Sequence, residues 1–253
     1  MTDNQVIKLS ELKSHCKNCS MYTLCLPMGL DTDDLDRLDN VIKRSQSINK
    51  NHFLYRMGEP LKSVYAIRSG SFKTYLTNPD GTEQIVGFSL PGELLGIDAI
   101  SDDKHTCTAK ALETASVCEI PFERLEALAR EIPNLQHQLL RLMSKEIQQD
   151  QNIMLLLAQM SAETRLASFL LGMSERLNKR GYAANEFNLS MSRGDIANLL
   201  GMAVETISRL LSHFQESGLL KVERKHITIL KLDELRKLAT HCASNHPDSS
   251  QVS

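Results

Sequence analysis

Cysteines are the residues of this chain with the clearest capacity for chemistry. Cys16, Cys19 and Cys25 lie close together near the N-terminus, and Cys107 and Cys118 follow far downstream. Four thiolates are the soft ligands that an iron–sulfur cube needs. A tetrahedral zinc ion accepts the same four sulfur atoms, and a redox thiol pair needs only two of them. The spacing predicts a metal or redox site and leaves these alternatives, and the fourth ligand, open.

A second group of residues has the pattern of a DNA-reading helix. In residues 193–210, Ala197 is small where two helices would cross, and Gly201 permits the tight turn between them. The apolar residues of this run form a shared core and leave three polar side chains on the outer face of the second helix, namely Glu205, Ser208 and Arg209. Arginine pairs with guanine and glutamate with the cytosine amino group, so we predict readout of a G·C pair. The alternative is an exposed Glu205–Arg209 salt bridge.

The elements around that helix fit a winged helix-turn-helix. Residues 162–238 are α-rich and end in a segment that resembles a short hairpin. This predicted wing carries four basic residues that could contact phosphates, Lys221, Arg224, Lys225 and Lys231. We expect the partner to be double-stranded DNA.

A long helix is predicted between Pro133 and Gln159, which contains no internal Gly or Pro. Its predicted seam, at steps of three and four residues, consists of Leu140, Met143, Ile147, Asp150, Met154 and Leu157. A second apolar row, Leu135, Leu139 and Leu142, could pack on the same subunit while the seam faces a partner. The two rows favour a homodimer over a helix buried in one core.

The segment from His52 to about Glu119 alternates short apolar stretches with Gly and Pro turns, which is typical of a β-sandwich or roll. Its best hairpin tip is Asn78–Gly81. We therefore predict an α+β protein. We expect a cysteine-rich stretch at 1–30, a β-roll sensory domain at 31–121 and a dimerisation-helix region at 122–160. A winged helix-turn-helix at 161–240 and a polar tail at 241–253 would follow.

Composition limits the function classes. The 253 residues include 29 Lys and Arg against 31 Asp and Glu, so any DNA contact must come from a local basic face. The longest apolar run, Ile153–Ala158, is far too short to cross a membrane, and residues 1–14 lack a signal-peptide pattern. We expect a cytoplasmic protein without a membrane partner. No nucleophile–base set, phosphate loop or dinucleotide fingerprint indicates an enzyme.

Taken together, residues 31–240 resemble the cyclic-AMP receptor family of bacterial transcription regulators. The resemblance rests on the β-rich N-terminal half, the long helix, and residues 205–209 followed by Gly218-Leu219-Leu220. The Cys16-x2-Cys19-x5-Cys25 spacing and residues 111–123 most resemble the oxygen-sensing iron–sulfur branch of that family, the FNR branch.

The resemblance implies an oxygen-labile 4Fe-4S cluster on Cys16, Cys19, Cys25 and Cys118, with Cys107 a small buried side chain and Cys242 in a tail without a scaffold. It implies activation or repression of genes for anaerobic life from inverted repeats with TTGAT-like half-sites. Exposed loops, including residues 78–82, would meet RNA polymerase. The position at which the family's phosphate-binding arginine is expected holds His105, which counts against a cyclic-nucleotide sensor. That sensor and a zinc or thiol-redox regulator are the alternatives.

Overall fold

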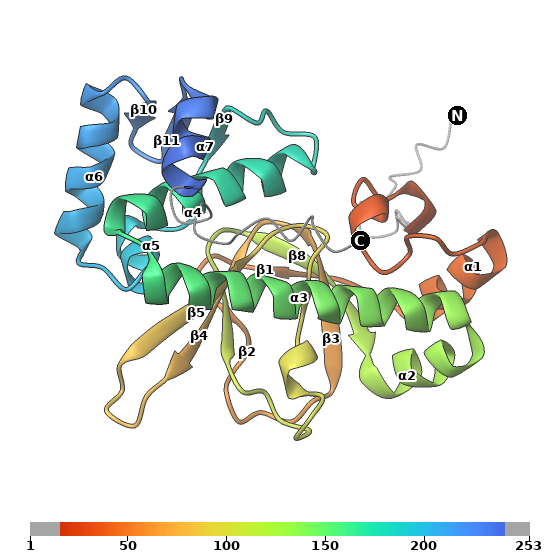
Figure 1. The fold of residues 1–253 in the computed structure, drawn as a ribbon. Coiled ribbons are helices and arrows are strands. Elements are labelled where there is room, and N and C mark those ends of the chain that lie inside the picture. The colour runs from red at the N-terminus through yellow and green to blue at the C-terminus, as the bar shows by residue number, and fades with distance from the viewer. Residues whose placement is uncertain (1–15, 241–253) are drawn as a thin grey trace, which may run out of the picture.

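The computed structural model describes residues 16–240. The expected polar tail, with Cys242, and the first half of the expected cysteine-rich stretch lie outside these residues. Figure 1 shows one long helix crossing the face of a β-roll, with the C-terminal helices at one end and the cysteine loop toward the other. This arrangement is the predicted α+β architecture.

The β-roll consists of two four-stranded antiparallel sheets. The first has the order β1-β8-β3-β6, with bounds Lys43–Ile48, Ala115–Pro121, Ser63–Ser69 and Leu94–Leu95. The second has the order β2-β7-β4-β5, with bounds Phe53–Tyr55, Thr108–Ala111, Phe72–Thr77 and Glu83–Ser89. The predicted tip between β4 and β5 is confirmed, since the Gly81 amide donates to the Asn78 carbonyl at 2.9 Å and Gly81 has a φ of 83°.

Three helices frame the roll. Helix α1 spans Thr32–Val41, α2 spans Phe122–Glu131, and the 27-residue α3 spans Pro133–Gln159, as predicted. Proline at the first turn of α3 is tolerated because that amide needs no intrahelical partner. Leu135 is fully buried, and Leu139 and Leu142 pack beside it on the same core. This confirms that the second apolar row packs within its own subunit.

The N-terminal loop differs from its prediction. It contains two 3₁₀ turns, Cys16–Asn18 and Tyr22–Leu24. Residues 1–30 show little apolar periodicity, which predicts a loop that has no core and is ordered only by a bound metal, and this prediction is wrong. Leu26 and Leu30 are 1% and 6% exposed and belong to the same apolar core as Leu125 and Leu128. Burial of these two leucines anchors the loop without any metal.

The C-terminal half contains helices α4 to α7, which span Ala162–Asn178, Arg193–Leu199, Val204–Glu216 and Leu232–Thr240. Its three-stranded sheet has the order β10-β11-β9, with bounds Leu220–Glu223, His226–Ile229 and Glu186–Asn188. The predicted hairpin is β10–β11, and β9 was not predicted. Ser192 and Asp195 form a capping box at the start of α5.

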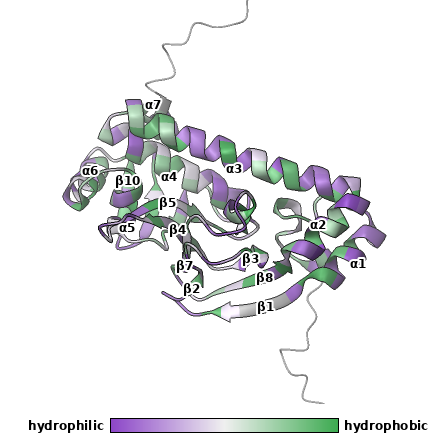
Figure 2. Ribbon diagram, turned by 90° about the horizontal axis from the view of Figure 1, so that it is seen from below, coloured by the Kyte–Doolittle hydropathy of each residue, from purple (hydrophilic) through white to green (hydrophobic). Residues whose placement is uncertain are grey.

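Hydropathy follows this architecture. Figure 2 shows polar and apolar residues alternating along α3, consistent with one face packed inward and one facing outward. Across residues 16–240, no helix combines the length and the apolar character that a membrane crossing requires.

Candidate functional site

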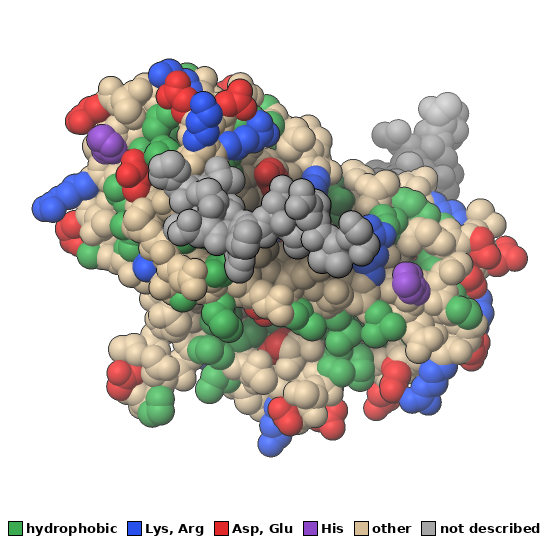
Figure 3. All heavy atoms as spheres, in the orientation of Figure 1, with side chains coloured by type: hydrophobic (Ala, Val, Ile, Leu, Met, Phe, Trp, Pro, Cys, Tyr) green, Lys and Arg blue, Asp and Glu red, His purple; other side chains and the backbone are tan. Residues whose placement is uncertain are grey.

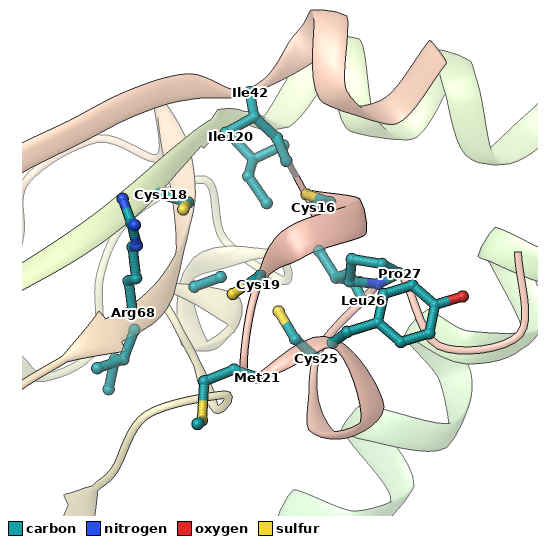
Figure 4. Close-up of a pocket in the computed structure, with 13 residues that line it drawn as sticks. Cys16, Cys19, Met21, Cys25, Leu26, Pro27, Ile42, Arg68, Cys118 and Ile120 are labelled. Carbon is teal, nitrogen blue, oxygen red and sulfur yellow. The ribbon is translucent and has the colours of Figure 1, made fainter. Parts of the chain in front are cut away.

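Four cysteines from two distant segments of the chain line one cavity. Cys16 begins the first 3₁₀ turn, Cys19 follows that turn, Cys25 follows the second, and Cys118 lies on β8. The pairing of Cys118 with Ala66 of β3 fixes its position in the sheet. Figure 4 shows the three loop cysteines facing Cys118, with their sulfur atoms turned toward the space between them.

The cavity is apolar apart from its thiols and Arg68. Its other walls include Met21, Leu26, Ile42 and Ile120. All four cysteines are thiols and half-buried. Burial raises the pKa of the Cys25 thiol to about 12, and burial together with Asp39 raises the pKa of Cys16 above the ordinary range. Without a metal these two thiols stay protonated at neutral pH, so a metal must displace protons when it binds.

The four thiols are spread around the cavity. No group of three His, Cys, Asp or Glu side chains among residues 16–240 converges as a single metal ion requires; the thiols surround a space instead. In a cube each of four irons takes one thiolate, so its ligands are spread apart. The cavity volume of about 30 Å³ corresponds to about two water molecules at most. The loop has to move outward to admit a cluster.

Cys107 lies in a different environment. It is 7% exposed inside the roll, with its sulfur 3.5 Å from an Asp98 carboxylate oxygen and 4.0 Å from the Tyr55 hydroxyl. Burial, followed by Asp98, raises the pKa of Cys107 to about 12. The prediction that Cys107 is buried is confirmed, although its neighbours are polar.

Polar contacts connect the cysteine loop to two helices. The Cys16 amide donates to Asp39 of α1 at 3.2 Å. Gln138 of α3 is 5% exposed, and its amide nitrogen donates to the Cys25 carbonyl at 3.3 Å. The loop that would hold a cofactor therefore contacts the helix that carries the predicted dimer seam.

The predicted reading face lies on α6. Ile207, Leu211 and Phe214 are buried, whereas Glu205 and Arg209 are exposed and Ser208 is half-exposed. The turn before α6 needs Gly201, whose φ is 62°. Within residues 16–240 no ion pair joins Glu205 to Arg209, so both groups are available to a ligand. Arg193 of α5 donates to the Ser208 hydroxyl at 3.3 Å.

The predicted wing is only partly available to phosphates. Lys221 pairs with Glu223 at 2.9 Å, and the ammonium of Lys225 donates to the Ser190 carbonyl at 2.7 Å. Arg224 is exposed at the tip between β10 and β11, where its φ is 60°.

The predicted seam forms an apolar stripe on α3. Leu140, Ile147 and Met154 recur every seven residues and are 59%, 57% and 70% exposed. Met143 and Leu157 are half-buried, and Asp150 is exposed between them. Figure 3 shows hydrophobic side chains gathered along the middle of the face that α3 crosses. Large apolar groups in such a row are typical of an interface.

Comparison with known proteins agrees with this geometry. Residues 164–238 match the Crp-like helix-turn-helix domain, and residues 45–131 match the cyclic nucleotide-binding domain. The chain is 52% identical over 227 residues to the fumarate and nitrate reduction regulatory protein of Escherichia coli (strain K12), which covers 90% of this chain and 91% of that protein.

The chain belongs to the Crp/Fnr family of transcription regulators. It is also 48% identical over 236 residues to the transcriptional activator protein Anr of Pseudomonas aeruginosa, covering 93% of this chain and 97% of that one. Among solved structures, FixK2 from Bradyrhizobium japonicum matches with a TM-score of 0.72 and 32% identity, over 78% of this chain and 97% of that one. This Crp/Fnr regulator therefore binds DNA through its helix-turn-helix, as predicted.

Within the roll, His105 stands where the resemblance places the family's phosphate-binding arginine. The His105 ring is buried and stacks on Tyr55 with 3.7 Å between ring centroids. The Asp98 carboxylate accepts from the Thr106 amide at 2.8 Å and lies 3.4 Å from His105. A carboxylate at this point repels a phosphate, so the geometry disfavours a nucleotide ligand in this Crp/Fnr regulator.

Several residues at these sites were missed by sequence reasoning. Gln138 and Arg68 have no local pattern that indicates their contacts. In sequence, Glu93 belongs to a stretch that resembles the start of the family's phosphate-binding segment, whereas in the structure it pairs with two arginines of the DNA-binding half. Their sequence separation hides such contacts until the fold is known.

Proposed function

We propose that this Crp/Fnr regulator is a cytoplasmic, non-catalytic oxygen sensor that holds a 4Fe-4S cluster on Cys16, Cys19, Cys25 and Cys118. One observation carries the proposal: three thiols from a loop and one from β8 face one apolar cavity. When bound, the cluster supplies an oxygen-labile link between the loop and the roll.

The position of the cavity supports a role in dimerisation. Gln138 connects the Cys25 carbonyl to α3, and the seam begins two residues further along, at Leu140. We infer that the cysteine loop fixes the start of α3 and so sets how well the seam residues meet those of a second copy. The chain then acts as a homodimer when the cysteines are ligated.

Two-fold symmetry determines the DNA that such a dimer binds. Two α6 helices, one from each copy, match an inverted repeat whose half-sites are about one helical turn apart. By the resemblance to the oxygen-sensing branch of the family, we propose TTGAT-like half-sites. The exposed tip at residues 78–82 is the surface that we assign to RNA polymerase.

The proposed function is tested by comparing the colour and the DNA binding of one preparation before and after its exposure to air. We expect anaerobically purified protein to be brown and to bind an inverted-repeat duplex. Brief exposure to air should remove both the colour and the DNA binding. A colourless anaerobic protein that binds this DNA equally well in air would contradict the proposal.

The reading face makes a separate prediction about specificity. Arg209→Ala should cost about 1–3 kcal/mol of binding free energy and relax the preference at one G·C pair, because a bidentate guanine contact is lost. Arg224→Ala serves as the matched control, because Arg224 is exposed at the tip of the wing: it should weaken all sequences alike and lower the salt slope by about one. Binding-site selection on the anaerobic dimer measures both. Equal loss of discrimination at every base with Arg209→Ala would show that this residue contacts only the backbone.

A further inference from the structure

A buried ion cluster joins the β-roll to the DNA-binding half of the same chain. Glu93 follows the turn at Pro91-Gly92, and its carboxylate accepts from Arg176 and Arg180 at 2.6 Å each. Arg176 lies in α4, and Arg180 lies just after its end. The side chains of Glu93 and Arg180 are 17% and 3% exposed, so this contact is largely shielded from solvent screening.

The two arginines hold the backbone of the turn as well as its carboxylate. Arg176 donates to the Phe88 carbonyl at 2.6 Å, and Arg180 donates to the Pro91 carbonyl at 2.7 Å. The Glu93 oxygen that accepts from Arg176, Oε2, also accepts from the Leu90 amide at 2.9 Å. Burial opposes ionisation of Glu93, but Arg176 and Arg180 outweigh it and hold its pKa below the ordinary value. Turn 88–93 is therefore fixed to α4 along its whole length by charged hydrogen bonds.

The other side of this turn contacts the cysteine loop. A Cβ atom added at Gly92 would lie 2.9 Å from the Leu24 Cβ and 3.7 Å from the Met21 Cβ, and Leu24 directly precedes Cys25. Gly92 also donates to the Ile67 carbonyl at 2.7 Å, and Ile67 lines the cavity of the four cysteines. Gly92, which contacts the cysteine loop, is therefore directly flanked by Pro91 and Glu93, which bind the arginines at the end of α4.

We propose that turn 88–93 couples the cysteine loop to the orientation of the DNA-binding half, with Glu93 as the positioning residue of this link. The inference rests on the proposed function, because the cavity must widen when a cluster is bound and Leu24 lies between the cavity and Gly92. Outward motion of the loop changes the packing on Gly92, and the arginine contacts carry that change to α4. The link acts within one chain, so it is independent of the dimer seam on α3.

Hydrogen exchange of the full-length protein tests the link directly. In the wild-type protein, removal of the cluster lets the loop pack on Gly92 again, so it should slow amide exchange in turn 88–93 and at residues 174–180 by about tenfold. Glu93→Gln keeps the size of the side chain and removes its charge. This variant should bind iron and dimerise as the wild type does, and it should still respond at the turn but no longer at residues 174–180.

Lys73→Met is the matched control. The Lys73–Asp195 pair also joins the roll to the DNA-binding half, at 2.8 Å and with side chains 15% and 17% exposed, but it does not touch the cysteine loop. This variant should keep the full response at residues 174–180. If Glu93→Gln does not fold, Arg180→Lys takes its place. This variant retains the charge and loses the forked contacts of the guanidinium, so it should reduce the response at residues 174–180.

The outcomes separate this link from the proposed function. If anaerobically purified wild-type protein contains no iron, both the proposed function and the link are overturned. If it contains iron but its amide exchange at residues 174–180 does not change when the cluster is removed, only the link is overturned. An equal loss of the exchange response at residues 174–180 in Lys73→Met and Glu93→Gln would also overturn the link. The response would then depend on any contact between the two halves and not on Glu93 in particular.

Discussion

Replacing any one of Cys16, Cys19, Cys25 or Cys118 by alanine is expected to abolish iron binding and specific DNA binding together. Each iron of a cube requires its own thiolate, and the four cysteines are the only thiols among the residues that line the cavity. The variant should retain only sequence-independent DNA affinity, which is about a thousandfold weaker or more. Iron analysis and titration with an inverted-repeat duplex, both without oxygen, measure the two losses.

Cys107→Ala is the matched control for this series. Cys107 is a buried thiol in the same roll, but its sulfur contacts Asp98 and Tyr55 and does not line the cavity. Its variant should keep iron and DNA binding. Loss of iron in Cys107→Ala combined with retention in Cys118→Ala would overturn the assignment of the fourth ligand.

Asp150→Ala is expected to produce a dimer that binds DNA in air. In a parallel dimer the seam brings two copies of Asp150 together, and at ~6 Å with an effective dielectric near 20 their repulsion is about 3 kcal/mol. Removing it should strengthen dimerisation by about a hundredfold. Burial already raises the pKa of Asp150 in the single chain. Protonation removes the same charge, so dimerisation of the wild type should strengthen as the pH falls.

Sedimentation equilibrium in air measures this effect. Gln151→Ala, an exposed change on the same helix and outside the seam, should leave the protein monomeric in air. Asp150→Ala that also stays monomeric would show that this carboxylate only fixes the register of the seam.

Local patterns predicted the DNA-binding half well. The helix-turn-helix is specified within residues 193–210 by small residues at the crossing, a glycine at the turn and apolar positions for the core. All these contacts are close in sequence. The wing was also predicted as a hairpin, but its third strand, β9, contains only Glu186–Asn188 and gives no alternation to detect.

The sensory half depended more on contacts between distant residues. Strand β1 was missed because Lys43–Ile48 is polar except at its end, so it lacks the apolar alternation of a strand. The spacing of cysteines could not choose between Cys107 and Cys118. Our proposal of Cys118 rests on the sheet register, which pairs Cys118 with Ala66 at the cavity. The contacts of Glu93 with α4 span more than eighty residues and require the assembled fold.

Anaerobic Mössbauer spectroscopy of the full-length protein, combined with iron and zinc analysis of the same sample, tests the central claim most directly. We expect about four irons per chain, the spectrum of a 4Fe-4S cluster, and no stoichiometric zinc. The spectrum should change on exposure to air as DNA binding is lost. One zinc ion per chain with no cluster spectrum, in protein that binds its DNA, would contradict the account.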